Sequence, residues 1–325
     1  MNDNYQDYKK VLRNFHQRIN DELTILLYHG VTNIKSRGIE NYSRKHISQD
    51  DFYSQMLYLR NNCNVISIDD YLGIRKSKEC LPPKSVIITF DDGFKNNYTV
   101  AAPILADLGL PSVFYYTSGV INTNIMFWVD IIEDCLNCCK NASIRIELDQ
   151  VYDFSIDSMD AKIIALKKIK EYAKNVSNSD WDRIVNDIQN ETGVEACVEH
   201  SENYEKITWN ELKRLHDNSL FTVGGHSMYH NILSYKTYIE MEEDIRSSID
   251  LLEINLKSSI CHFAYPEGEA HHYNNDVKDV LRKYGILCSP TAIPGLNSLN
   301  TDPFHLRRIM VGFKGLPFPF YNNNY

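Results

Sequence analysis

The chain has 325 residues, of which 43% are hydrophobic and 24% charged, a composition typical of globular proteins that bury a large core. A formal net charge of −9 at pH 7, without any cluster of Lys and Arg, argues against nucleic acid as a partner. No apolar run approaches the ~18 residues of a transmembrane helix, and the charged segment 1–15 lacks the apolar stretch of a signal peptide. We therefore expect a soluble, cytoplasmic protein without a transmembrane segment, whose oligomeric state the sequence does not indicate.

Apolar runs and helical periodicity alternate in the first third of the chain. The elements expected there, in chain order, are a helical lead-in over 1–20, a strand over 23–30, a helix capped by Ser48, a strand over 85–90, a helix over 98–108 and a strand over 112–117. Strand, helix and strand in this order predict a parallel sheet with crossover helices.

The composition changes to Lys, Asp and Asn over about 120–205, which we interpret as a helical insertion. The elements expected within and after it are helices over 126–139 and 161–175, a strand over 142–148, a strand over 221–225, a helix over 238–256 with a Thr237–Glu240 capping box, and strands over 260–265, 286–289 and 306–311. We therefore expect one domain over 21–313 that contains the insertion, followed by a loosely held tail over 314–325.

The eight cysteines are expected to be reduced thiols, because no export signal precedes them. Cys135, Cys138 and Cys139 have a C-x-x-C-C spacing that could hold a metal ion. A zinc site usually requires a second Cys or His pair at matching spacing, and none is near in the sequence. Packing is therefore the preferred interpretation of these three residues.

Two adjacent carboxylates, Asp91 and Asp92, follow the strand expected over 85–90 and precede Gly93. Like charges this close raise the pKa of one group unless a cation compensates them. A metal ion on one carboxylate would leave the other free to move protons. The alternative is an Asx turn, because Asp-Gly is a common turn dipeptide.

A histidine pair follows the strand expected over 221–225. His226 and His230 are four residues apart, which on a helical turn places their Cβ atoms about 5–6 Å apart, close enough to bind one ion. Imidazole suits zinc and its first-row neighbours. An isolated His-x-x-x-His pair is often incidental, but a position after Gly-Gly at a strand end favours a site.

A third segment, 261–268, reads as a strand that leads into a Pro turn, whose backbone N–H groups could face an oxyanion. A plain strand followed by a turn is the alternative.

Because the carboxyl ends of parallel strands meet at one mouth, the three segments together predict one Asp and two His as metal ligands. A second Asp beside them could then deprotonate a bound water that attacks a carbonyl.

T-F-D-D-G at 89–93, H-S-x-x-H at 226–230 and F-A-Y-P-x-G at 263–268, in this order, resemble the polysaccharide deacetylase family (carbohydrate esterase family 4). Segments 27–31, 208–212 and 302–309 also resemble parts of this family, so that the resemblance covers about 23–312 apart from the insertion. It implies an α/β fold, an irregular (β/α) barrel with fewer than eight strands and a helical insertion.

The resemblance also implies site residues. Asp91 corresponds to the general base, and Asp92, His226 and His230 correspond to the ligands of one divalent transition metal ion, usually zinc. Ser227 corresponds to a hydroxyl that supports the first histidine.

Tyr265, Pro266 and the backbone N–H of Glu267 correspond to the turn that lines the acetyl pocket and the oxyanion site.

Two family positions lack a counterpart. Ala264 stands where many members have an Arg that orients the catalytic Asp, and no clear Leu-x-His supplies a general acid. We assign the Arg role to Arg308 and the acid role to His29, ahead of His305. A salt bridge without a catalytic role is the alternative for Arg308, and a core histidine is the alternative for either His.

The resemblance implies a metal-dependent hydrolase that removes an N-acetyl group from an amino sugar. Without an export signal, we expect the substrate to be a saccharide or a lipid- or nucleotide-linked glycan precursor, in surface polysaccharide biosynthesis. Two alternatives remain, a hydrolase of a non-sugar amide or formamide and a catalytically inactive sugar-binding barrel. The inactive barrel would have no need to keep four costly polar groups together.

Overall fold

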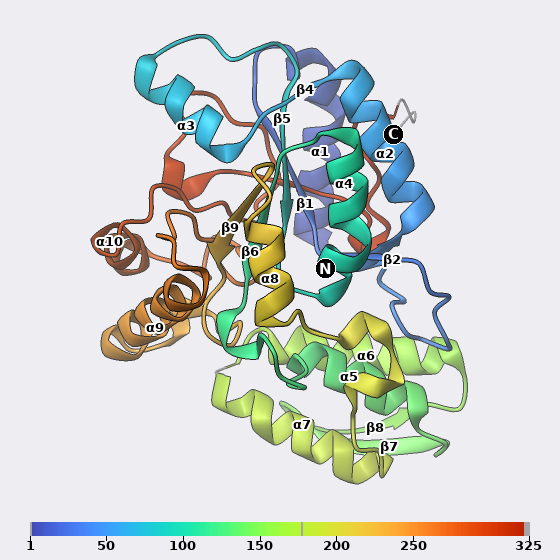
Figure 1. Cartoon of the computed structure of the whole chain (residues 1–325). Coiled ribbons are helices and arrows are strands. Elements are labelled where there is room, and N and C mark those ends of the chain that lie inside the picture. Colours follow the sequence, from blue (N-terminus) through green and yellow to red (C-terminus); the bar gives the residue numbers. More distant parts are fainter. Residues whose placement is uncertain (1, 177, 322–325) are drawn as a thin grey trace. The chain divides into compact units, whose positions relative to one another are not determined.

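The computed structural model describes residues 2–176 and 178–321, which form two compact units (Figure 1). Unit 1 comprises the described residues of Met1–Asn33, Ser43–Asn122 and Ile207–Tyr325. Unit 2 comprises those of Ile34–Tyr42 and Thr123–Lys206. Nothing in the sequence of 34–42 indicates that this segment belongs with the second unit.

Unit 1 is built on a six-stranded parallel sheet in the order β10-β1-β5-β6-β9, with β4 beside β5. Strands β1, β4, β5, β6 and β9 are labelled in Figure 1. Its strands are β1 (Thr24–Tyr28), β4 (Asn64–Val65), β5 (Ser85–Phe90), β6 (Ser112–Tyr116), β9 (Phe221–Gly225) and β10 (Ile309–Met310). A short parallel pair, β2 (Gly30–Thr32) and β3 (His46–Ser48), follows β1. The α/β fold and its parallel sheet are thereby confirmed.

Isolated bridges continue the sheet from β9 back toward β10 and close an irregular barrel. They join Gly225 to Phe263, His262 to Cys288 and Pro290 to Leu306. The expectation of full strands over 260–265, 286–289 and 306–311 was therefore wrong, apart from the two-residue β10. Proline interrupts a ladder because it has no backbone N–H, and Pro266, Pro290 and Pro303 stand beside these segments.

The helices of unit 1 are α1 (Asn2–Arg18), α2 (Gln49–Asn62), α3 (Ile68–Ser77), α4 (Ala102–Leu108), α8 (Trp209–His216), α9 (Tyr238–Leu256) and α10 (Asn275–Lys283). Ser48 caps α2 by accepting a hydrogen bond from the Asp51 N–H, and Thr237 and Glu240 form the expected capping box of α9. The helix expected over 98–108 begins as a π-helical turn, Asn97–Ala101, before α4.

The central strands are buried along their whole length, which explains why they are continuous apolar runs. Alternate residues serve two separate clusters. Ile87 and Val113 pack with Leu306 and with Ile68 of α3, whereas the side chains on the opposite face pack under α2, α4 and α9. Side chains at every second position after Ile87 therefore lie on the same face of the sheet as Ile87, which we call the inner face.

The N-terminal helix and the described part of the C-terminal tail both contribute to the core of unit 1. Leu12 and Phe15 of α1 are buried, and the Phe15 ring lies edge-on to Phe320 at 5.0 Å between centroids. Phe318 and Phe320 are also buried, so the described part of the tail is not loosely held as expected. The rest of that tail, 322–325, lies outside the described residues.

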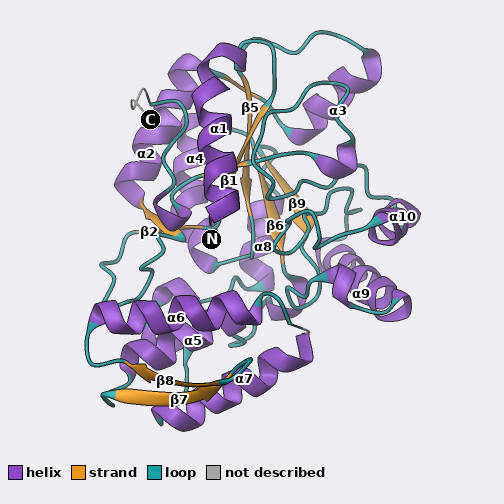
Figure 2. Ribbon diagram, turned by 180° about the vertical axis from the view of Figure 1, so that it is seen from behind, coloured by secondary structure: helices purple, strands orange, loops and turns teal. Residues whose placement is uncertain are grey.

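Unit 2 contains α5 (Trp128–Cys138), α6 (Met159–Ala173), α7 (Asn178–Thr192) and the antiparallel hairpin of β7 (Ser143–Glu147) and β8 (Val151–Ser155), as Figure 2 shows. Side chains of β7 alternate between exposed and buried, which is typical of a strand with one packed face. Neither β8 nor α7 was expected from the sequence.

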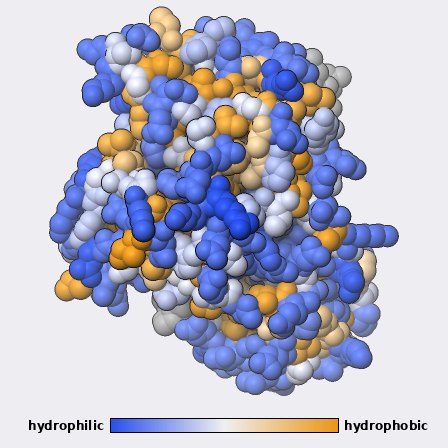
Figure 3. Space-filling view, in the orientation of Figure 1, coloured by the Kyte–Doolittle hydropathy of each residue, from blue (hydrophilic) through white to orange (hydrophobic). Residues whose placement is uncertain are grey.

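No helix in the described part of the chain is both long and apolar enough to span a membrane. The face of the molecule in Figure 3 is largely hydrophilic, and its apolar residues form separate patches. All eight cysteines, each of which the structure describes, are free thiols.

Candidate active site

Asp91 and Asp92 follow β5 directly, and both are buried. Asp91 continues the alternation of Ile87 and Thr89, so that its side chain lies on the inner side of the sheet. Its backbone N–H donates to the Tyr28 carbonyl at 3.0 Å, which extends the contact between β5 and β1 by one residue. The strand ladder thus fixes where this carboxylate lies.

The turn after Asp91 has an unusual backbone. Asp92 and Gly93 have φ values of 77° and 90°, and a Cβ atom at Gly93 would lie 2.5 Å from the Tyr116 ring. Only glycine combines this φ with so close an approach at low cost.

We expect Gly93→Ala to lower the free energy of unfolding by about 3 kcal/mol, because a strained φ and a clash with a buried ring add together. Denaturant unfolding would measure this change. Gly109→Ala is the matched control, since Gly109 has a φ of 66° but no atom near its Cβ position. Equal losses in the two variants would contradict a role for the contact with Tyr116.

His226 and His230 converge on Asp92. The Nε2 atoms of His226 and His230 lie 3.5 and 3.3 Å from Asp92 Oδ1, and the two rings are 5.0 Å apart. They do so from a turn and not from the expected helix, because Ser227 and His230 both have φ values of 61°. The left-handed backbone, and not helical spacing, aims the two rings at one point.

The three side chains fit a metal ion. Ligand atoms about 2.1 Å from a tetrahedral ion are about 3.4 Å apart, close to the two N–O separations observed here. His226 Nδ1 donates to the Ala264 carbonyl at 2.8 Å, which leaves Nε2 as the ligand atom. Burial opposes ionisation of Asp92, but its contacts with His226 and His230 hold its pKa well below the usual value.

The support expected from Ser227 is absent. Its hydroxyl is buried and has no hydrogen-bond partner among the described residues, and the Ala264 carbonyl orients His226 instead. Ala264 can do this with its backbone because its own N–H donates to Gly225 at the end of β9.

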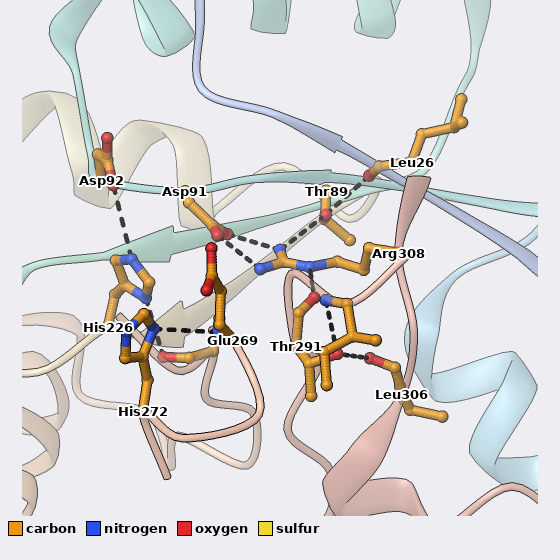
Figure 4. A network of polar contacts seen from close by, with 12 residues as sticks. Leu26, Thr89, Asp91, Asp92, His226, Glu269, His272, Thr291, Leu306 and Arg308 are labelled. Atoms are coloured by element: carbon orange, nitrogen blue, oxygen red, sulfur yellow. Dashed lines mark hydrogen bonds and ion pairs between the residues drawn. The ribbon is translucent and has the colours of Figure 1, made fainter. Parts of the chain in front are cut away.

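Arg308 holds Asp91 through two parallel hydrogen bonds, as Figure 4 shows. Nη1 donates to Oδ1 at 2.8 Å and Nη2 to Oδ2 at 2.7 Å, while Nε donates to the Thr291 carbonyl at 2.6 Å. Burial raises the pKa of Asp91, but the charges of Arg308 and then of His226 outweigh it, so the pKa is lowered. The carboxylate is therefore ionised and held in one orientation.

Arg308 can reach Asp91 because it lies beside β10, which pairs with β1, and β1 in turn pairs with β5. Arg308 directly precedes β10, and its side chain crosses under β1 to reach the end of β5, where Thr89 also accepts from Nη1 at 3.2 Å. Thr89 and Thr291 were not among the site residues expected from the sequence. The only signal for Thr89 was its place two residues before Asp91 on the inner face.

His29 lies at the end of β1 with its ring 5.3 Å from that of Phe313. Burial lowers the pKa of His29, although the charges of Asp92 and Asp91 oppose the change. Its Nδ1 is buried and has no hydrogen-bond partner among the described residues. His305, the second candidate, instead bonds the Tyr273 hydroxyl.

The Pro turn presents its backbone more than its side chains. The Tyr265 hydroxyl donates to the Phe304 carbonyl at 3.0 Å, and its buried ring stacks on Tyr273 at 4.1 Å. Pro266 follows, and Glu267 and Gly268, with φ values of 58° and 62°, reverse the chain. The hydroxyl and the ring of Tyr265 are therefore both held by contacts within unit 1.

Comparisons with known proteins agree with this geometry. The family model described as "Polysaccharide deacetylase" matches residues 78–288, which is more than half of the chain. No curated protein matches the sequence.

Several solved structures share the fold. The IcaB structure from Ammonifex degensii is 20% identical, with 90% of this chain and 92% of that chain covered and a TM-score of 0.57. The deacetylase PplD from Streptococcus pyogenes, in complex with acetate, is 15% identical, with 92% and 96% covered and a TM-score of 0.60. A de-N-acetylase from Aggregatibacter actinomycetemcomitans is 16% identical, with 93% and 97% covered and a TM-score of 0.56.

Proposed function

Since the chain belongs to the polysaccharide deacetylase family and is a carbohydrate N-deacetylase, we propose that it is a metal-dependent hydrolase that releases acetate from an N-acetylated amino sugar. The observation that carries this proposal is the ionised Asp91, held by Arg308 beside the converging Asp92, His226 and His230. A proton acceptor next to three metal ligands is what hydrolysis of an amide requires.

A zinc-like ion held by Asp92, His226 and His230 would lower the pKa of water and polarise the acetamide carbonyl. Asp91 accepts the proton that leaves the attacking water, and Arg308 keeps this carboxylate ionised until then. The backbone N–H of Glu267 donates to the carbonyl oxygen as negative charge develops on it. His29 delivers a proton to the amine as the C–N bond breaks, which releases acetate and the free amino sugar.

Arg308 has a positioning role that a pH profile can detect. The base works only when ionised, and without Arg308 the burial of Asp91 raises its pKa. We expect Arg308→Met to move the acidic limb of kcat/KM to higher pH by about one to three units, and Arg308→Lys to move it less. The exposed Arg307→Met is the control. A lower rate with an unmoved pH profile in Arg308→Met would indicate a purely structural role.

His29 is neutral at pH 7 before the reaction because burial lowers its pKa. A neutral imidazole must first accept a proton, so we propose that His29 takes up the proton that Asp91 removed from water and then donates it to the leaving amine. We expect His29→Gln to lower kcat by about 100-fold with little change in KM, measured by steady-state acetate release. His305→Gln should leave kcat nearly unchanged, and equal losses in both variants would exclude His29 as the donor.

The family description names polysaccharides, and we propose as substrate a saccharide or its lipid- or nucleotide-linked precursor, made for a surface polysaccharide. The test is acetate release by the metal-loaded protein from N-acetylated oligosaccharides and from nucleotide- and lipid-linked N-acetyl amino sugars. We expect turnover of one of these classes that stops on chelation and returns on reloading. Binding of a glycan without release of acetate would contradict the proposal, as would turnover confined to a small non-sugar amide.

A further inference from the structure

Unit 2 contains a second group of side chains that can hold a metal ion. Asp134 and Cys138 are four residues apart on α5 and so share one face of this helix. His200 ends the short turn Val198–His200 and lies against the same face. Asp134, Cys138 and His200 each place one ligand atom within 4.8 Å of those of the other two.

The distances within this group are close to those of a tetrahedral site. Cys138 Sγ lies 3.6 Å from Asp134 Oδ1 and 4.0 Å from His200 Nδ1, and His200 Nδ1 lies 2.7 Å from Asp134 Oδ2. With one S, one N and one O ligand around a tetrahedral ion, all three separations would be about 3.4–3.7 Å. To bind one ion, the His200–Asp134 pair must spread by about 0.7 Å and the Cys138–His200 pair must approach by about 0.3 Å. The two contacts of Asp134 use different oxygens, so its carboxylate must also turn, and the His200 side chain is 41% exposed.

Buried negative charge surrounds this group. The side chains of Asp130, Glu133, Asp134 and Glu40 are all buried within unit 2. Burial raises the pKa of Tyr204 well above its usual value, and the charges of these same four carboxylates raise it further. The negative charge around the group favours a cation over an anion there.

The three side chains border a cavity, and a backbone hydrogen bond also holds the Asp134 carboxylate. This cavity has a volume of about 250 Å³, and its lining also includes Glu40, Glu199 and Tyr204. The backbone N–H of Cys197 donates to Asp134 Oδ2 at 3.2 Å, so the carboxylate has a second contact that orients it. Glu199 or water from the cavity can supply a fourth ligand.

We propose that Asp134, Cys138 and His200 bind one zinc-like ion, at a site in unit 2 that is distinct from the active site and links α5 to the 198–200 turn. Binding replaces the Cys138 S–H bond with a sulfur–metal bond and releases the proton to water. The mixture of one thiolate, one imidazole and one carboxylate favours zinc over calcium or magnesium, which prefer oxygen ligands. The earlier interpretation of Cys138 as a packing residue missed His200, because 62 residues separate the two in the sequence.

The test is cobalt(II) loading of the full chain, followed by metal analysis and absorption spectroscopy. The active-site ligands include no sulfur, so a sulfur-to-cobalt charge-transfer band in the near ultraviolet reports the second site alone. We expect about two ions per chain and this band in the unmodified protein. Cys138→Ser and His200→Ala should each lose the band and one ion, whereas His226→Ala should lose one ion and keep the band.

Cys80→Ser is the matched control, because Cys80 is also an exposed thiol but lies in unit 1. Absence of the band in the unmodified protein would overturn the proposal, whether or not any variant folds. Loss of the band in Cys197→Ser but not in Cys138→Ser would overturn the assignment of the sulfur ligand. Because the band does not depend on turnover, failure of this site and failure of the proposed deacetylase activity are separate results.

Discussion

Replacing Asp91 with Asn is expected to lower kcat/KM for acetate release by about 10,000-fold, the upper end of what general base catalysis contributes. Asn has nearly the same shape as Asp but cannot accept the proton of the attacking water. The Arg308 guanidinium can still donate to the amide oxygen, so the side chain keeps one of its two hydrogen bonds. Steady-state kinetics on the metal-loaded variant would measure the loss.

Two further measurements make the Asp91→Asn result specific. Metal content should stay at the unmodified level, because Asp92, His226 and His230 are untouched. The free energy of unfolding should fall by about 3 kcal/mol, since a buried arginine loses its charged partner. A variant that is folded, loaded with metal and as active as the unmodified protein would exclude Asp91 as the base.

The His226→Ala variant is expected to lose acetate release because it loses the metal ion, and not because it lacks a proton acceptor. Removal of one of three protein ligands should weaken metal binding at the active site by at least ~100-fold, and acetate release should fall to the level of the chelated protein. His226 also bonds the Ala264 carbonyl, so the Pro turn loses its link to the metal ligands at the same time. Metal analysis and the rate of acetate release before and after reloading would measure both effects.

The exposed His16→Ala is the control for His226→Ala, because it removes an imidazole far along the sequence from any ligand. High metal concentration should partly restore His226→Ala but not Asp91→Asn. Full activity of His226→Ala at low metal concentration would contradict the assignment of His226 as a ligand.

The central strands could be predicted from the sequence because each is buried on both faces and therefore reads as an unbroken apolar run. The strand expected over 85–90 coincides with β5, and the caps at Ser48 and Thr237 are local hydrogen-bond patterns that the sequence encodes directly. The closing side of the barrel could not be predicted in this way. Its contacts are single bridges between distant segments, which leave no periodic pattern.

The same distinction applies to the candidate site. The order of motifs indicated Asp91, Asp92, His226 and His230, but the backbone turn that aims the two histidines depends on positive φ values at Ser227 and His230 that residue spacing does not reveal. The group Asp134, Cys138 and His200 was missed for a related reason. Only the tertiary fold of unit 2 brings His200 back to α5.

The bridges that close the barrel have a consequence for how unit 1 moves. The wall from β1 to β9 is held by continuous ladders, whereas the wall from Phe263 to Leu306 has a few isolated pairings, so amide protons there should exchange with deuterium sooner. Asp91, Asp92, His226 and Arg308 stand directly beside strands of the continuous sheet, whereas the Pro turn belongs to the other wall. Asp91, Asp92 and His226 thus stand on the part of the barrel with continuous ladders, and the Pro turn stands on the part with isolated bridges, where we expect local opening to cost less free energy.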